Sequence, residues 1–202
     1  MSTASIAPRE AEPFIEEPWI LPSRGMVGIV CLIVAESAVF IIFVIAYLFY
    51  LGKSISGPSP QDVLDLPVVG TICLLSSSLT VWLAAGALRK SRVRMCSLWL
   101  AATVLLGSIF LAATAREWYQ LIYEHGLTIH TNLFGTTFYS LVGLHASHVI
   151  AGLAMLALAL AFALFGRMTG EHAERLEILS IYWHFVDAVW VVVFTVVYVL
   201  GR

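Results

Sequence analysis

The chain has 202 residues, of which 60% are apolar and only 12% charged. Soluble domains carry about 25% charged residues, so this chain has too little polar surface to cover a globule in water. The composition therefore excludes a typical soluble enzyme and a disordered chain. With a formal net charge of −2, the chain also offers no basic surface for nucleic acid.

The apolar residues form five continuous runs, each long enough to cross a bilayer as a helix of about 20 residues. Continuous runs favour helices over barrel strands, in which apolar and polar residues alternate. The sequence therefore predicts an all-α integral membrane bundle of five transmembrane helices over residues 26–202, preceded by an extended cytoplasmic tail at residues 1–25. The predicted spans are 26–50, 66–88, 95–115, 134–165 and 176–200.

Basic residues divide unequally between the two sides that five crossings define. The N-terminal side carries Arg9, Arg24, Arg89, Lys90, Arg92, Arg94, Arg167 and Arg175. The other side carries only Lys53, Arg116 and Arg202. Because cytoplasmic loops are enriched in Lys and Arg, the division predicts a cytoplasmic N-terminus and a C-terminus outside.

The small residues and cysteines suggest where the helices pack. Stripes with a spacing of four residues, in which small side chains would let helices approach closely, are Gly143, Ser147 and Ala151 in the fourth run and Ser76, Thr80 and Ala84 in the second. The cysteines form neither a CxxC pair nor an even set for disulfides. We therefore interpret Cys31, Cys73 and Cys96 as small core residues.

Two carboxylic acids are predicted deep in the membrane. Glu36 is ten residues and Asp187 eleven residues from the start of its run, which places them about 15 and 17 Å deep at a rise of about 1.5 Å per residue. A charged side chain at such a depth costs about 2.5–3.5 kcal/mol on insertion scales. These acids must therefore be protonated, paired or turned towards other helices.

Three histidines lie at similar depth in the fourth and fifth runs. His145 and His148 are three residues apart, as are His184 and Asp187, so each pair shares a helix face. Trp183 and Trp190 flank Asp187 at helical spacing. The cluster of Glu36 with these histidines and Asp187 admits three interpretations: helix packing through interior hydrogen bonds, proton movement, and ligation of a metal or haem. Di-iron bundles use several Glu residues beside their histidines, whereas only Glu36 is available at this depth, so no metal site is assigned.

Several segments then point to a family. The stretch Tyr182-Trp183-His184-Phe185-Val186-Asp187-Ala188-Val189-Trp190 closely resembles the last-helix signature of subunit III of haem-copper terminal oxidases. Segments in the same order and spacing are Ala35-Glu36-Ser37 with Phe40, Leu106-Gly107 through Phe110 to Glu117-Trp118, and Phe134-Gly135-Thr136-Thr137-Phe138 through Gly143, His145, His148-Val149 and Gly152. The chain is similar to the five-helix bacterial form, and the likeness covers residues 26–202.

The resemblance implies a non-catalytic subunit that carries no cofactor of its own. Haem and copper would belong to partner subunits I and II of a cytochrome c oxidase in the bacterial inner membrane. Subunit III would pack on subunit I, bind phospholipid, and support proton uptake and the stability of the catalytic subunit. Arg167, at the cytoplasmic end of the fourth span, is the candidate for holding a lipid phosphate.

Other functions stay open at this point. Within the same superfamily, an o-type quinol oxidase has a similar subunit III, and a homologue accompanies some nitric oxide reductases. From a different class, a stand-alone membrane haem or metal enzyme would use the midplane histidines. The electron donor is chosen by other subunits, so this sequence leaves it undecided.

Overall fold

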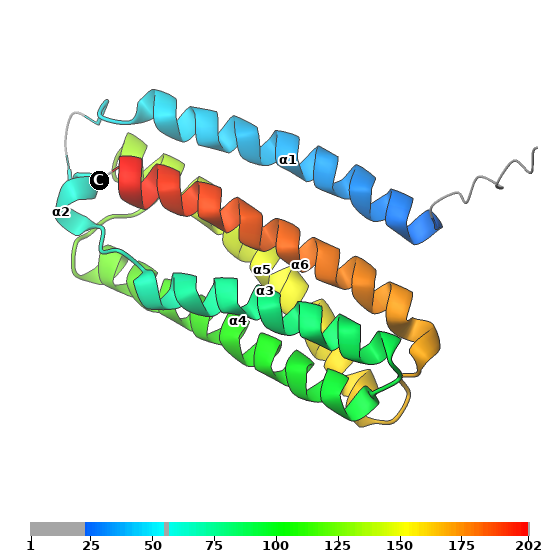
Figure 1. Cartoon of the computed structure of the whole chain (residues 1–202). Helices are drawn as coiled ribbons and strands as arrows, with labels where there is room; N and C mark the ends of the chain where they lie inside the picture. Colours follow the sequence, from blue (N-terminus) through cyan, green and yellow to red (C-terminus); the bar gives the residue numbers. More distant parts are fainter. Residues whose placement is uncertain (1–22, 55–56, 202) are drawn as a thin grey trace, which may run out of the picture.

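A computed structural model describes residues 23–54 and 57–201, in which the regular structure is helical throughout (Figure 1). The long helices are α1 (Arg24–Tyr50), α3 (Val68–Arg89), α4 (Val93–Tyr123), α5 (Leu133–Leu164) and α6 (Ala173–Phe194). Short elements are α2 (Pro60–Val63), the 3₁₀ turn η1 (Gly170–His172) and the π-helical turn η2 (Thr195–Leu200), which continues α6. All five predicted membrane-spanning helices are confirmed. Residues 1–22 of the predicted tail lie outside the described residues.

Four predicted spans agree with the helices to within three residues, but the third was predicted too short. Helix α4 continues to Tyr123, eight residues beyond the predicted end at residue 115. The apolar run ends there because Arg116 and Glu117 follow, yet neither residue breaks a helix. Arg116 is exposed, whereas the Glu117 carboxylate accepts a hydrogen bond from Tyr198 Oη at 2.8 Å.

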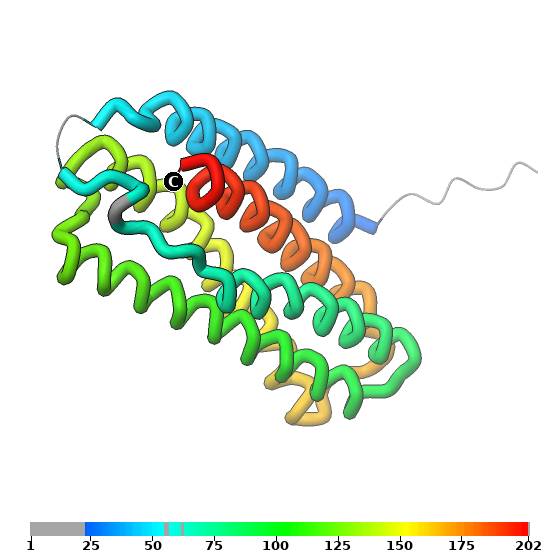
Figure 2. The backbone as a smooth tube through the Cα atoms, turned by 60° about the vertical axis from the view of Figure 1, so that its left-hand side comes forward, coloured from blue at the N-terminus to red at the C-terminus, as the bar shows by residue number. Residues whose placement is uncertain are grey.

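Helix α6 lies inside the bundle. It packs against α1, α3 and α5, while α3 and α4 form a closely packed antiparallel hairpin and α4 also packs against α5. Helix α1 packs mainly against α5 and α6, and only Ile29, Phe40 and Tyr47 among its residues are buried. The tube view shows α1 lying along one side of the other helices (Figure 2). Most of the core therefore lies between α3, α4, α5 and α6.

Trp183 occupies the centre of this core, and glycines on two other helices make room for its ring. A Cβ atom added to Gly107 of α4 would lie 3.1 Å from the ring, and one added to Gly152 of α5 only 2.8 Å from it. The indole Nε1 donates to Ser77 Oγ of α3 at 2.8 Å. One residue thus holds α6 against three neighbours.

The predicted stripes of small residues were right only in part, and one cysteine assignment was wrong. In the second run, Ala84 is fully buried and Thr80 bonds to Thr103 of α4 at 2.8 Å. Ser76, Ser147 and Ala151 face outwards, whereas Ser77, Ala146 and Gly152 are buried at the helix contacts. Small residues lie where bulky side chains of α6 need room. A spacing of four residues does not show which face of α3 or α5 meets α6. Cys96 is buried as expected and Cys73 is half-buried, but Cys31 is exposed on α1.

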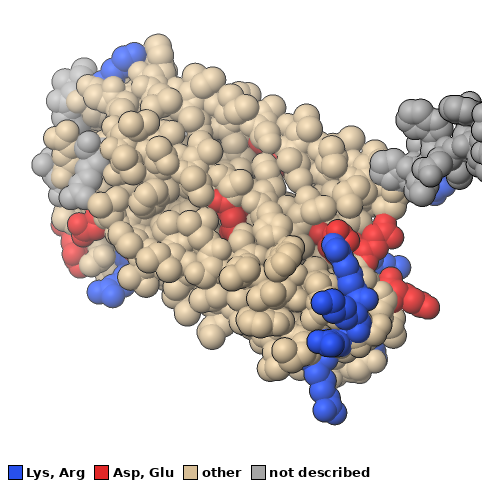
Figure 3. Space-filling model, viewed as in Figure 1, with Lys and Arg blue, Asp and Glu red and all other residues tan. Residues whose placement is uncertain are grey.

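Charged side chains gather at the ends of the bundle, and most of the middle of the visible face is uncharged (Figure 3). We call the end formed by the α3–α4 turn and the α5–α6 connection the basic end. Its cations are Arg89, Lys90, Arg92, Arg94, Arg167 and Arg175. Arg89 of α3 forms an ion pair with Glu177 of α6 at this end. Which end faces the cytoplasm remains a prediction from the basic residues.

Candidate functional site

The five polar residues predicted at membrane depth do not form one cluster. Glu36 pairs with His148, and His184 joins Asp187 through a serine of α3. His145 lies apart from both pairs, in contact with aromatic rings. Among residues 23–54 and 57–201, no group of three or more His, Cys, Asp or Glu is placed to hold a metal ion. The arrangement suits hydrogen bonding between helices and the binding of protons.

Glu36 and His148 connect α1 to α5. Glu36 Oε2 lies 3.3 Å from His148 Nε2, and His148 Nδ1 lies 2.8 Å from the carbonyl oxygen of Leu144. A carbonyl oxygen can only accept, so Nδ1 carries a proton and Nε2 faces the carboxyl group. A hydrogen bond between Nε2 and Oε2 requires a proton on one of these two atoms, and a pair joined in this way carries no net charge. Neutrality reduces the cost of placing a carboxyl group at this depth.

His184 and Asp187 meet α3 at Ser78, which the sequence analysis did not identify. Ser78 Oγ lies 3.0 Å from His184 Nδ1 and donates a hydrogen bond to Asp187 Oδ2. On the other side of the imidazole, His184 Nε2 lies 3.2 Å from Ser180 Oγ. Asp187 is 4% exposed, and its Oδ1 has no partner among the described residues. The consecutive serines 76–78 in an apolar run indicated a polar helix face. They did not indicate which of the three serines points towards α6.

His145 is the most deeply buried of the five predicted residues, at 1% exposure. Its ring stacks on Trp190 with centroids 5.0 Å apart, and Phe110 lies edge-on to it with centroids 6.0 Å apart. Neither ring nitrogen has a hydrogen-bond partner among the described residues. Trp190 itself donates to Thr71 Oγ1 of α3 at 3.1 Å. His145 thus belongs to an aromatic layer with Trp190 and Phe110.

Glu117 lies towards the end opposite the basic end. Its carboxylate accepts from Tyr198 of η2, and the neighbouring Trp118 packs edge-on against Tyr139 of α5 at 5.3 Å between centroids. These contacts fasten the end of α4 to α5 and η2.

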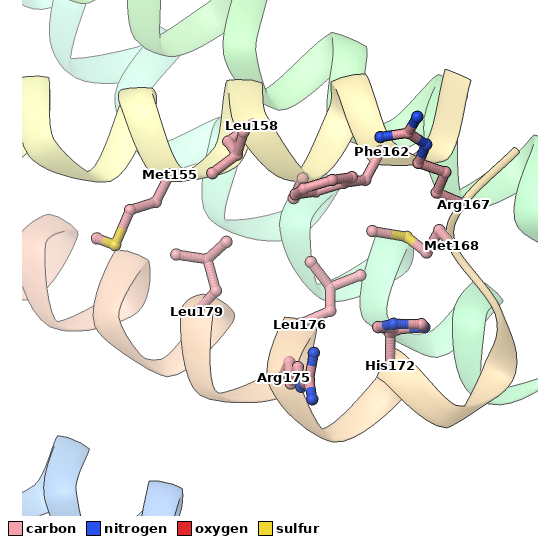
Figure 4. Close-up of a pocket in the computed structure, with 10 residues that line it drawn as sticks. Met155, Leu158, Phe162, Arg167, Met168, His172, Arg175, Leu176 and Leu179 are labelled. Carbon is pink, nitrogen blue, oxygen red and sulfur yellow. The ribbon is translucent and has the colours of Figure 1, made fainter. Parts of the chain in front are cut away.

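Arg167 lines a groove of about 390 Å³ between α5 and α6 at the basic end. Gly166, at φ +69, turns the chain after α5 through a left-handed conformation that glycine adopts readily. Figure 4 shows side chains of α5 and α6 facing each other across the groove, with Arg167, His172 and Arg175 towards the connection between the helices. The apolar walls are formed by Met155, Leu158, Ala159, Phe162, Met168, Leu176 and Leu179.

The fold and these polar pairs define a multi-pass helical membrane protein whose deep polar groups join helices to one another. The chain matches the family described as Cytochrome c oxidase subunit III over residues 23–202. It therefore belongs to the cytochrome c oxidase subunit III family, as the sequence motifs predicted.

Relatives of two kinds are similar to the chain. It is 36% identical to cytochrome c oxidase subunit 3 of Alkalihalophilus pseudofirmus over 168 residues, 82% of each chain. It is 38% identical to the protein of the same name from Synechocystis, over 89% of this chain and 77% of the relative. The cytochrome bo(3) ubiquinol oxidase subunit 3 of Pseudomonas aeruginosa is 37% identical over 77% of this chain and 75% of the relative. The chain is thus a subunit III of the haem-copper oxidase family, of the cytochrome c or the quinol type.

Proposed function

We propose that this chain is the non-catalytic subunit III of a bacterial cytochrome c oxidase, which reduces dioxygen to water and translocates protons. In this proposal it packs on subunit I in the inner membrane, while subunits I and II carry the haem and copper. Its own contribution is to hold phospholipid and to support proton uptake and the stability of the catalytic subunit. Family membership over residues 23–202 supports the assignment.

The groove between α5 and α6 is the observation that carries the lipid part of the proposal. Its apolar walls match an acyl chain, and the guanidinium groups of Arg167 and Arg175 stand at the basic end, where a phosphate headgroup lies. Guanidinium groups bind phosphate oxygens through charge-assisted hydrogen bonds. In the described part of the chain, neither arginine forms an ion pair with a carboxylate. A phospholipid would place its acyl chain against the apolar walls and its phosphate beside the two arginines.

Lipid analysis of the purified oxidase tests this role. We expect Arg167→Gln to lower the phospholipid retained per complex and to speed the loss of activity during turnover. Arg94→Gln serves as the matched control, because Arg94 is also an exposed cation of the basic end but lines no groove described here. Equal lipid retention in Arg167→Gln and Arg94→Gln would contradict the proposal.

The partial exposure of Glu36 supports a partner against α1 and α5. Its side chain is 29% exposed, about 18 Å along α1 from Arg24 at 1.5 Å per residue. Lipid tails cannot satisfy a polar group at that depth. We therefore place subunit I over this part of the α1 surface. Cross-linking from a photoreactive residue at Val39, which is exposed one turn along α1, should capture subunit I, and capture of lipid alone would contradict this placement.

The similarity to the bo(3) subunit favours a second candidate, an o-type quinol oxidase. Two measurements on the purified complex separate them: the copper content of subunit II and the rates with reduced cytochrome c and with quinol. We expect copper in subunit II and oxidation of cytochrome c. A copper-free subunit II with quinol oxidation would establish the alternative, and nitric oxide reduction would place the chain with that enzyme instead. A haem absorption band in the isolated chain would instead support the interpretation that this chain is a stand-alone membrane enzyme.

A further inference from the structure

Asp187 is connected to a groove at the basic end by a chain of hydrogen bonds. The groove, of about 210 Å³, lies between α3 and α6 and is lined by Trp82, Ala85, Gly86, Arg89, Glu177, Ser180, Ile181 and His184. Its mouth holds the ion pair of Arg89 and Glu177, whose side chains are 56% and 38% exposed. Ser180 and His184 form its inner wall, so the groove reaches the first members of the chain.

From this wall, the contacts continue without a gap to Asp187. Ser180 Oγ lies 3.2 Å from His184 Nε2, and Ser78 Oγ lies 3.0 Å from His184 Nδ1 and bonds to Asp187 Oδ2. Ser78 is eleven residues before Arg89, the last residue of α3, which places the inner end of the chain about 16 Å from the basic end. Asp187 is 4% exposed and its Oδ1 has no partner among the described residues.

The chain has two self-consistent hydrogen-bond directions. With an ionised Asp187, Ser180 donates to His184 Nε2, Nδ1–H donates to Ser78, and Ser78 donates to the carboxylate. With a protonated Asp187, the carboxyl group donates to Ser78, Ser78 donates to Nδ1, and Nε2–H donates to Ser180. The two states differ by one proton, which neutral imidazole can pass by accepting at one nitrogen and releasing at the other.

We propose that Asp187 is a proton-binding site that exchanges its proton with the basic end of the bundle, through Ser180, His184 and Ser78. A hydronium ion in the groove gives a proton to Ser180 and becomes water, the Ser180 proton moves to His184 Nε2, and the Nδ1 proton leaves for Ser78. The Ser78 proton moves to Asp187 in the same transfer, so no charge is left on the intermediate groups. This relay is separate from the lipid groove between α5 and α6 and stands whether or not lipid binds there.

Other titratable groups near α6 have different contacts. Arg89 and Glu177 pair with each other at the mouth of the groove. Glu36 of α1 faces His148 of α5, and His145 of α5 stacks on Trp190. No hydrogen bond between these groups and Asp187 is present in the described residues. His184 is therefore the one titratable group that the contacts connect to Asp187.

Infrared spectroscopy of the assembled oxidase in vesicles tests the relay, with the carboxylic C=O band of Asp187 assigned by its loss in Asp187→Asn. After a pH jump on the side of the basic end, we expect His184→Gln to slow the band's change roughly 100-fold, the typical contribution of a positioned proton-transfer group. Glutamine keeps a donor and an acceptor but cannot exchange them. A purely structural role for His184 therefore predicts no change in this variant.

Substitutions of serine on α3 provide the controls. Ser78→Ala should slow the exchange, and Ser78→Thr should restore it because threonine keeps the hydroxyl group. Ser76→Ala should exchange at the normal rate, because Ser76 is exposed on the same helix and outside the chain. A normal rate in His184→Gln, an equal response to a pH jump on the opposite side, or the absence of an Asp187 band at every pH would overturn the proposal.

Discussion

At the scale of single residues, the position of Trp183 depends on two glycines that have no side chain. Gly107 and Gly152 have no side chains, and the ring of Trp183 fills that space. Protein interiors are packed as densely as crystals, so a methyl group placed there must displace the ring. The motif Tyr182–Trp190 and these glycines are therefore in contact in the fold, although they are distant in the sequence.

Gly152→Ala should therefore destabilise the subunit within its complex by about 1–3 kcal/mol through overpacking. The added Cβ would lie 2.8 Å from the Trp183 ring. Gly86→Ala is the matched control, because a Cβ there meets nothing within 4 Å. Thermal release of the subunit from the purified oxidase measures both variants. Equal release temperatures would show that Trp183 can move aside without cost.

At the scale of elements, the sequence predicted each long helix but not every end or contact. Apolar runs set the spans because lipid requires them, whereas α4 continues past Arg116 through contacts of Glu117 and Trp118 with other helices. Likewise, the depth of Glu36 and Asp187 followed from counting residues along a helix. Their partners did not, because partner choice depends on helix rotation, and neighbouring residues such as Ser76, Ser77 and Ser78 point in different directions.

Helix α1 is held to α5 by one polar contact between Glu36 and His148. We expect Glu36→Gln to leave assembly intact and to change turnover only modestly, because the amide can donate to His148 Nε2 while Nδ1 still donates to Leu144. Glu36→Leu should weaken the attachment of α1 by about 0.6–1.7 kcal/mol, the average and the largest value measured for such bonds in a membrane protein. Subunit content and oxygen consumption of the purified complexes test both variants. Complete loss of oxygen reduction in an assembled Glu36→Gln complex would contradict a supporting role.

Asp187 provides one of the polar contacts between α6 and α3, beside those of Trp183 and Trp190. Asp187→Leu should lower the amount of subunit III per subunit I, because the hydrogen bond from Ser78 to Asp187 is lost at a cost of about 0.6–1.7 kcal/mol. Asp187→Asn retains an acceptor and should assemble normally. Asp65→Leu, at an exposed acid outside the bundle's core, is the control for the loss of charge. Normal stoichiometry in Asp187→Leu would show that α3 and α6 associate without this bond.

At the scale of the whole molecule, the two ends differ in charge while the spans between them are almost uncharged. Arg89, Lys90, Arg92 and Arg94 lie within one short stretch around the α3–α4 turn, and Arg167 and Arg175 flank η1 at the same end. The groove between α5 and α6 and the groove leading to His184 both lie at this end. The orientation of the chain therefore decides which compartment supplies protons to Asp187.

Because Lys and Arg are retained on the cytoplasmic side, the basic end should face the cytoplasm. In a chain with alanine at Cys31, Cys73 and Cys96, an impermeant maleimide added to intact cells should label Lys53→Cys. It should label Arg92→Cys only after the membrane is permeabilised. Both positions are exposed in turns at opposite ends of the bundle, so accessibility within the fold is matched. The reverse pattern would place the basic end outside, and the proton that reaches Asp187 would then come from the outer compartment.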